Sequence, residues 1–175
     1  MSDTANRQKY TPLPVGENHN CFGCSPKNTS GLHMEFSVNE KRDTVVSWLS
    51  VPDHLCGWGN IVHGGIISTM LDEAMGWAAL VLLGKLVLSK SISVEFFRPV
   101  FIGKDIRVEG SVLEVRSDRE GVMQGSIYDG NELCAKSSSV CSLFTLDYIK
   151  KMGVADEKML NDLEVLISQF VSKQT

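Results

Sequence analysis

The longest apolar stretch of the chain runs from about Ile66 to Leu83 and contains few polar side chains. Its length and its almost continuous hydrophobicity predict a helix that is buried on most sides in a protein core. Gly84 follows directly and predicts the end of this helix, because glycine readily adopts the left-handed conformation that follows many helices. Asp72 and Glu73 lie inside the stretch and would be very costly in lipid, so the pattern argues against a transmembrane span.

Segments typical of strands lie on both sides of the helix. Two of them, HMEFSVN and TVVSWLSV, fall between Leu32 and Val51 and are separated by the charged turn at 40–43. After the helix the hydrophobic period changes from 3.6 to 2, and the alternation predicts one strand face made of Leu88, Lys90, Ile92, Val94 and Phe96. Three further strands are predicted at 105–116, 121–128 and 132–144. The turns between them are too short for helical crossovers, so we expect antiparallel pairing.

These elements predict an α+β fold in which an antiparallel curved sheet wraps around one long central helix. Apolar residues at helical spacing between Asp156 and Val171 add a C-terminal amphipathic helix. The 175 residues suit one domain, which we place at 19–147, with an N-terminal arm at 1–18 and a C-terminal helical extension at 148–175. An open sheet edge and the remaining apolar surface predict a dimer.

Composition narrows the class of protein. The chain has 17 Lys and Arg against 21 Asp and Glu, a net charge of −4, and 43% hydrophobic residues. These values are ordinary for a globular domain and lack the basic footprint of a general nucleic-acid binder. The first residues lack the charge and apolar core of a signal peptide, and the five cysteines are an odd number, so we expect reduced thiols and a cytoplasmic location.

The predicted helix carries a narrow polar stripe made of Thr69, Asp72, Glu73 and Gly76. A carboxylate on a mostly buried helix tends to have a raised pKa and is a candidate general base. The alternative is structural: the acids form a solvated stripe or pair with an arginine on a strand.

The sequence His63-Gly64-Gly65 stands at the start of the same helix. It places two unhindered backbone N–H groups at the positive end of the helix dipole, which suits a developing oxyanion. The alternative is that the glycines only permit a tight turn and close packing.

Gly64 and Asp72 are eight residues apart, or about 12 Å along a helix, so one carbonyl group cannot meet both in the same chain. If both act on one substrate, the carboxylate comes from a second subunit, with two equivalent sites per dimer.

The segments IVHGGIISTMLDEAMGWA (61–78) and SKSISVEFFRPV (89–100) resemble those of hotdog-fold acyl-CoA thioesterases of the phenylacetate-pathway (PaaI-like) type. The resemblance covers about residues 20–145. It implies the hotdog fold and hydrolysis of an acyl-CoA thioester to free acid and CoA by a homodimer or homotetramer. It implies no cofactor, since coenzyme A is part of the substrate, and it points to neither a nucleic-acid partner nor a membrane.

The resemblance also assigns roles. The Gly64 N–H would be the oxyanion donor, and His63 would orient the thioester carbonyl. Asp72 of the neighbouring subunit would act as general base or nucleophile, and Ser89 would hold the water. Glu73, the next residue along the helix, is the reserve candidate for the acid.

The substrate-binding candidates are Gly65, Asn60, Lys90 and Arg98, the last two, together with Lys104, for the phosphates of coenzyme A. Exposed basic side chains can equally serve only to solvate a surface. Many relatives carry Asn or Gln six or seven residues before the histidine of the motif, whereas Asn60 is out of register here. A non-catalytic acyl-CoA sensor or carrier on the same fold is therefore the alternative. A hydroxyacyl dehydratase ranks last, because the helix lacks the expected Asp and His pairing.

Two further sets of residues carry alternatives. Cys21-x-x-Cys24, with His19 and His33 nearby, has zinc-ligand chemistry, but a second cysteine pair at zinc spacing is missing, so we expect no metal site. The pattern from Cys21 to Leu32 recurs in related thioesterases and predicts an ordered loop near the substrate tunnel. The aromatic residues that either line an acyl pocket or belong to the core are Trp58, Trp77, Phe96 and Phe97.

Overall fold

The computed structural model describes residues 7–171. In chain order its elements are β1 (Tyr10–Pro12), β2 (Phe36–Asn39), β3 (Thr44–Ser50), the 3-10 turn η1 (Asp53–Leu55), β4 (Cys56–Trp58), β5 (Ile61–Val62), α2 (Gly64–Leu83), β6 (Leu86–Phe96), β7 (Asp105–Ser117), β8 (Glu120–Asp129), β9 (Glu132–Phe144), α3 (Leu146–Met152) and α4 (Glu157–Phe170).

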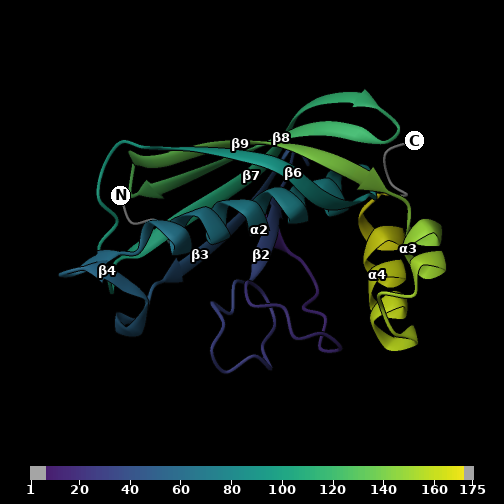
Figure 1. Cartoon of the computed structure of the whole chain (residues 1–175), viewed down its shortest axis with the longest axis horizontal. Coiled ribbons are helices and arrows are strands. Elements are labelled where there is room, and N and C mark those ends of the chain that lie inside the picture. Colours follow the sequence, from purple (N-terminus) through teal and green to yellow (C-terminus); the bar gives the residue numbers. More distant parts are fainter. Residues whose placement is uncertain (1–6, 172–175) are drawn as a thin grey trace.

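One antiparallel sheet of seven strands, in the order β1-β2-β3-β7-β8-β9-β6, curves around α2 (Figure 1). The helices α3 and α4 lie together at one end of the sheet (Figure 1). The predicted α+β fold, with a curved antiparallel sheet around a long central helix and a C-terminal amphipathic helix, is confirmed. The short helix α3 was not predicted; it begins where the Thr145 side chain accepts a hydrogen bond from the backbone N–H of Tyr148.

The central helix begins two residues before the predicted start. The side chain of His63 accepts a hydrogen bond from the Gly65 N–H and so caps the helix, which lets Gly64 and Gly65 join its first turn. The helix ends as predicted, since Gly84 follows it with a left-handed φ of 65°. Upstream of the helix, β4 and β5 form a small antiparallel hairpin.

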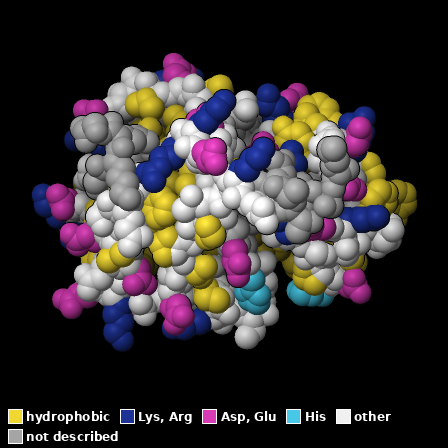
Figure 2. All heavy atoms as spheres, turned by 180° about the vertical axis from the view of Figure 1, so that it is seen from behind, with side chains coloured by type: hydrophobic (Ala, Val, Ile, Leu, Met, Phe, Trp, Pro, Cys, Tyr) yellow, Lys and Arg dark blue, Asp and Glu magenta, His cyan; other side chains and the backbone are white. Residues whose placement is uncertain are grey.

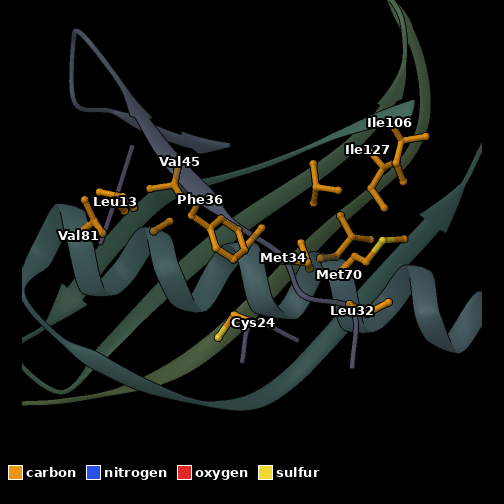
Figure 3. Packing of buried hydrophobic residues seen from close by; sticks show 14 of the residues in the cluster. Leu13, Cys24, Leu32, Met34, Phe36, Val45, Met70, Val81, Ile106 and Ile127 are labelled. Carbon is orange, nitrogen blue, oxygen red and sulfur yellow. The ribbon is translucent and has the colours of Figure 1, made fainter. Parts of the chain in front are cut away.

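The core lies between α2 and the concave face of the sheet. Figure 3 shows sheet residues such as Val45, Ile106 and Ile127 near the helix, together with Cys24 and Leu32 from the loop before β2. Within the described residues, α2 is the one helix long and apolar enough to cross a membrane, and 56% of its most apolar window is buried inside the molecule. This degree of burial fits the predicted core helix.

A pair of glycines lets the helix approach the sheet closely. Gly110 in β7 and Gly125 in β8 face each other across the two strands. A Cβ added at Gly110 would lie 2.1 Å from the backbone oxygen of Ala74, which belongs to α2. The backbone of the helix therefore rests directly on this strand.

Gly110→Ala is expected to destabilise the protein by about 1–3 kcal/mol, because a well-packed core can admit a methyl group only if the helix backbone shifts. Urea unfolding of the variant measures this loss. Ser111→Ala, which changes the half-exposed neighbour on the same strand, serves as the control and should alter the free energy of unfolding by less than about 0.5 kcal/mol. An unchanged stability of Gly110→Ala would contradict the close contact.

The edge strand β6 differs from its predicted alternation. Ser89 pairs with Cys141 and Ser91 with Val140, so Lys90 is an extra residue that forms a β-bulge. Ser89 consequently shares the helix-facing side of the sheet with Ile92, and Leu88 lies on the opposite side. The predicted single face from Leu88 to Phe96 is wrong, because the hydrophobic period does not reveal where one residue is left out of the pairing.

Much of β6 and the segment after it is open to solvent. Leu88 is 59% exposed, Ile92 40%, Phe96 54% and Phe97 52%. Large apolar side chains on an unpaired strand edge are typical of a surface that pairs with another chain. Elsewhere the surface is mixed, and on the face shown in Figure 2 acidic and basic side chains are interspersed.

Candidate active site

The N-terminus of α2 presents one available backbone donor. His63 Nδ1 accepts a hydrogen bond from the Gly65 N–H at 2.9 Å, so this second N–H of the motif is used within the chain. Among the described residues, the Gly64 N–H has no acceptor, as is usual for the first turn of a helix. The two free donors predicted at this turn are thus reduced to Gly64 alone. Because Nδ1 accepts, a neutral His63 ring carries its proton on Nε2, which makes Nε2 a further donor.

Nearby groups shape this donor site. A Cβ at Gly64 would lie 3.7 Å from Phe96 Cζ, so the exposed Phe96 ring borders the turn. The hydroxyl groups of Ser68 and Thr69 donate to the backbone oxygens of Gly64 and Gly65, at 3.0 and 2.9 Å. The Thr69 hydroxyl, part of the predicted polar stripe, is therefore engaged with its own helix.

Two turns further along α2, Asp72 meets Ser89 of β6. The Ser89 Oγ donates a hydrogen bond of 2.6 Å to Asp72 Oδ1, and both residues are exposed. They line a cleft of about 450 Å³ between α2 and the first half of β6. The structure brings these two predicted residues together through the bulge at Lys90, which turns the Ser89 side chain toward the helix.

Glu73 also borders this cleft, but its hydrogen bonds point to the N-terminal loop. Its Oε1 accepts from Trp77 Nε1 at 3.2 Å, and its Oε2 lies 3.5 Å from Cys21 Sγ. Burial raises the pKa of Glu73 to about 7. The carboxyl group with the raised pKa expected on this helix is therefore Glu73, whereas Asp72 is open to solvent and held by a serine.

The continuous helix α2 separates the predicted oxyanion donor, the Gly64 N–H, from the predicted general base, Asp72. Since α2 is continuous from Gly64 to Leu83, the Gly64 N–H and Asp72 are about 12 Å apart along its axis. One small carbonyl group cannot reach both within a single chain. The structure brings together Asp72 with Ser89 and His63 with Gly64 and Gly65, as two separate clusters.

The substrate-binding candidates Asn60, Lys90 and Arg98 are exposed. Lys90 Nζ lies 2.6 Å from Glu120 Oε2, and Arg98 lies 2.8 Å from Glu132, so a phosphate would compete with an internal partner for each. Lys104 is exposed. The Asn60 side chain is exposed in the turn between β4 and β5.

The aromatic candidates separate into exposed and packed residues. Trp58 is 85% exposed, whereas Trp77 stacks on Phe36 with a centroid distance of 5.0 Å. Trp77 also lines an apolar cavity of about 310 Å³ between the N-terminal segment, α2 and α4. The sequence did not indicate that α4 would form a wall of this cavity. The apolar pattern of α4 shows which of its faces is buried, but not which distant segment that face contacts.

In the structure, neither His19 nor His33 joins Cys21 and Cys24 in the set of possible metal ligands that the sequence suggested. His33 Nε2 bonds to the Asn28 oxygen at 2.6 Å, while His19 Nδ1 accepts from the Cys21 N–H at 3.3 Å. Both cysteines instead approach Glu73. A hydrogen bond with Cys24 lowers the pKa of the Cys21 thiol to about 5, and the same bond, aided by burial, raises the pKa of Cys24.

The curved antiparallel sheet wrapped around one long helix defines the class as a hotdog-fold protein. Residues 59–135 match the family model of the thioesterase superfamily. The matched segment contains the motif at 63–65, Asp72 and β6, and the match agrees with the resemblance to hotdog-fold thioesterases seen in the sequence. No curated protein matches the chain in sequence.

Solved structures agree with the fold. A thioesterase from Haemophilus influenzae is 26% identical, with a TM-score of 0.58 over 70% of this chain and 85% of its own. The PaaI protein from the phenylacetic acid degradation operon of E. coli is 19% identical, with a TM-score of 0.57 over 65% of this chain and 80% of its own.

Two further structures extend the comparison. A thioesterase superfamily protein is 18% identical, with a TM-score of 0.65 over 70% of this chain. The match covers only 60% of that protein's own length. A Streptococcus mutans protein solved with acetyl-CoA has a TM-score of 0.55 at 12% identity, over 78% of this chain and 89% of its own. At these identities the similarity shows the shared fold.

Proposed function

We propose that the chain is a thioesterase that hydrolyses an acyl-CoA thioester to a free acid and CoA. One observation carries the proposal: Asp72, held by Ser89 at 2.6 Å, faces an open cleft on the helix whose N-terminus offers the free Gly64 N–H. The match of residues 59–135 to the thioesterase superfamily model supports the reaction class, and the acetyl-CoA in the Streptococcus mutans structure supports the substrate class.

The proposed mechanism uses the two clusters on opposite sides of one thioester. The Gly64 N–H and the positive end of α2 bind the carbonyl oxygen, and the proton on His63 Nε2 adds a second donor. Asp72 from the partner protomer removes a proton from water, whose oxygen attacks the carbonyl carbon. The resulting tetrahedral intermediate carries its negative charge at the Gly64 N–H. The C–S bond then breaks, and the proton on Asp72 passes to the leaving CoA sulfur.

A homodimer is part of this proposal. Because Gly64 and Asp72 lie about 12 Å apart along α2, the Asp72 carboxylate that serves a given Gly64 must come from another chain. The exposed side of α2 at Asp72 and the unpaired edge of β6 with its apolar side chains are the surfaces we assign to the interface. Ser89, which donates to Asp72, orients the carboxylate for the water.

A thiol-release assay over acetyl-, hexanoyl-, dodecanoyl- and phenylacetyl-CoA tests the activity. We expect release of CoA from at least one substrate at a rate well above that in buffer. Saturable binding of acyl-CoA without release from any member of the panel would support the non-catalytic sensor or carrier and overturn the hydrolase.

A mixing experiment tests the shared site. Asp72→Asn and Gly64→Pro chains, each inactive alone, should regain activity when co-expressed, because a mixed dimer contains one intact site with its Asp72 from one chain and its Gly64 from the other. Random pairing makes half of the dimers mixed, so about one quarter of the wild-type activity is expected. A mixture as inactive as the separate variants would show that both groups act within one chain or not together.

A further inference from the structure

We propose that Cys21, Cys24 and Glu73 bind a zinc ion that joins the N-terminal loop to the central helix. The inference does not depend on the proposed hydrolase activity, because the donors belong to a cluster with its own geometry. The Sγ atoms of both cysteines and a carboxylate oxygen of Glu73 all lie within 4.8 Å of one another. Among the described residues, this is the one group of three or more metal-ligand side chains so closely placed.

The spacing of the donors agrees with tetrahedral zinc. Zinc binds thiolate at about 2.3 Å and carboxylate oxygen at about 2.0–2.2 Å, so two such ligands on a tetrahedral ion lie about 3.5 Å apart. Cys21 Sγ lies 3.5 and 3.6 Å from the two carboxylate oxygens of Glu73. An ion can therefore enter between the groups with only small side-chain movements.

The surroundings hold these donors in place. The Gly23 N–H donates to Cys21 Sγ at 3.3 Å, and the Trp77 Nε1–H donates to Glu73 Oε1 at 3.2 Å. Hydrogen bonds of this kind orient the side chains that bind the ion in metal sites. A Cβ at Gly23 would lie 2.5 Å from the Glu73 carboxyl group, so this glycine is needed for the helix and the loop to come so close.

The backbone of the loop is also ordered by its own contacts. Leu32 and Met34 donate to the backbone oxygens of Phe22 and Gly23, at 2.8 and 2.9 Å, which anchors the CxxC turn to the segment before β2. The Ser25 hydroxyl donates to the His19 oxygen at 2.7 Å. A loop held in this way presents both thiols to the helix at little further cost in conformational entropy.

The chemistry of the donors selects the metal. Two thiolates and one carboxylate favour zinc over magnesium or calcium, which prefer oxygen ligands. Three protein ligands leave the fourth position to water or to a bound molecule. Cys21 and Cys24 line the apolar cavity of about 310 Å³, and Glu73 lines the cleft at Asp72, so the ion would lie in the wall between the two.

The test uses the full-length chain purified under reducing conditions and measures binding of zinc by competition with a chromophoric chelator. Cobalt is the spectroscopic probe, because tetrahedral Co²⁺ with thiolate ligands gives both visible absorption and near-ultraviolet charge-transfer bands. We expect one equivalent of zinc per chain, these cobalt bands, and a higher melting temperature with zinc than after chelation.

Single substitutions measure how much each side chain contributes to zinc affinity. Cys21→Ser and Cys24→Ser should each weaken zinc binding by at least about 100-fold and remove the charge-transfer bands. Trp77→Phe keeps the ring beside Phe36 but loses the hydrogen bond to Glu73, so we expect binding to weaken by about 10-fold. Cys56→Ser changes the exposed cysteine in β4 and is the matched control, with unchanged affinity and spectrum expected.

Three results would overturn the proposal, and the first two need only the unaltered chain. The first is the absence of zinc binding together with a cobalt spectrum free of thiolate bands. The second is a disulfide between Cys21 and Cys24 that forms even with zinc present, detected as a mass loss of about 2 Da under non-reducing conditions. The third is equal zinc affinity in Cys24→Ser and Cys56→Ser.

Discussion

Asp72→Asn is expected to lower the turnover of acyl-CoA by about 10²–10⁴-fold, with the fold intact, because the amide cannot take the proton from water. The change keeps the size of the side chain, and the Ser89 hydroxyl at 2.6 Å can still donate to the amide oxygen. Initial rates of CoA release, combined with the melting temperature, separate the chemical effect from a loss of structure.

The matched control for this variant is Asp147→Asn, which removes an exposed carboxylate in the first turn of α3. It alters the net charge equally and should keep the wild-type rate. If Asp72→Asn keeps full activity while Glu73→Gln abolishes it, the general base is Glu73, and the assignment moves by one residue.

Gly64→Pro is expected to lower kcat by about 10²–10³-fold, because it deletes the one backbone N–H that the helix start leaves available to an oxyanion. The local structure allows this substitution. Gly64 is the first residue of α2, a position where proline is common, and the extended conformation of His63 (φ −60°, ψ 135°) suits the residue before a proline.

Gly64→Ala provides the control, since it keeps the N–H and its Cβ meets only Phe96 Cζ, at an ordinary distance of 3.7 Å. Its kcat should stay within about 10-fold of the wild type, and the unfolding midpoints of both variants should be similar. Equal rates in the proline and alanine variants would show that this N–H does not stabilise the transition state.

The sequence by itself determined the central helix, the antiparallel pairing of β7, β8 and β9, and the resemblance to thioesterases. The apolar stretch before Gly84 is long enough to specify a helix, and the hairpin turns after 117 and 129 leave room only for antiparallel pairing. Both signals depend only on residues close together in the chain, so the amino-acid sequence contains them. The motif at 63–65 and the acid nine residues after His63 lie on one helix, where spacing alone gives their separation.

Only the tertiary structure decided which side chains meet. The bulge at Lys90 places Ser89 against Asp72, and the folding of the N-terminal loop onto α2 gives Glu73 its cysteine neighbours and its raised pKa. The hydrogen bond from Gly65 to His63 likewise selects Gly64 as the available donor. Hydrophobic periodicity shows which residues are buried. Contacts between distant segments depend on strand register and on the surface that each helix packs against. A local sequence pattern determines neither of these.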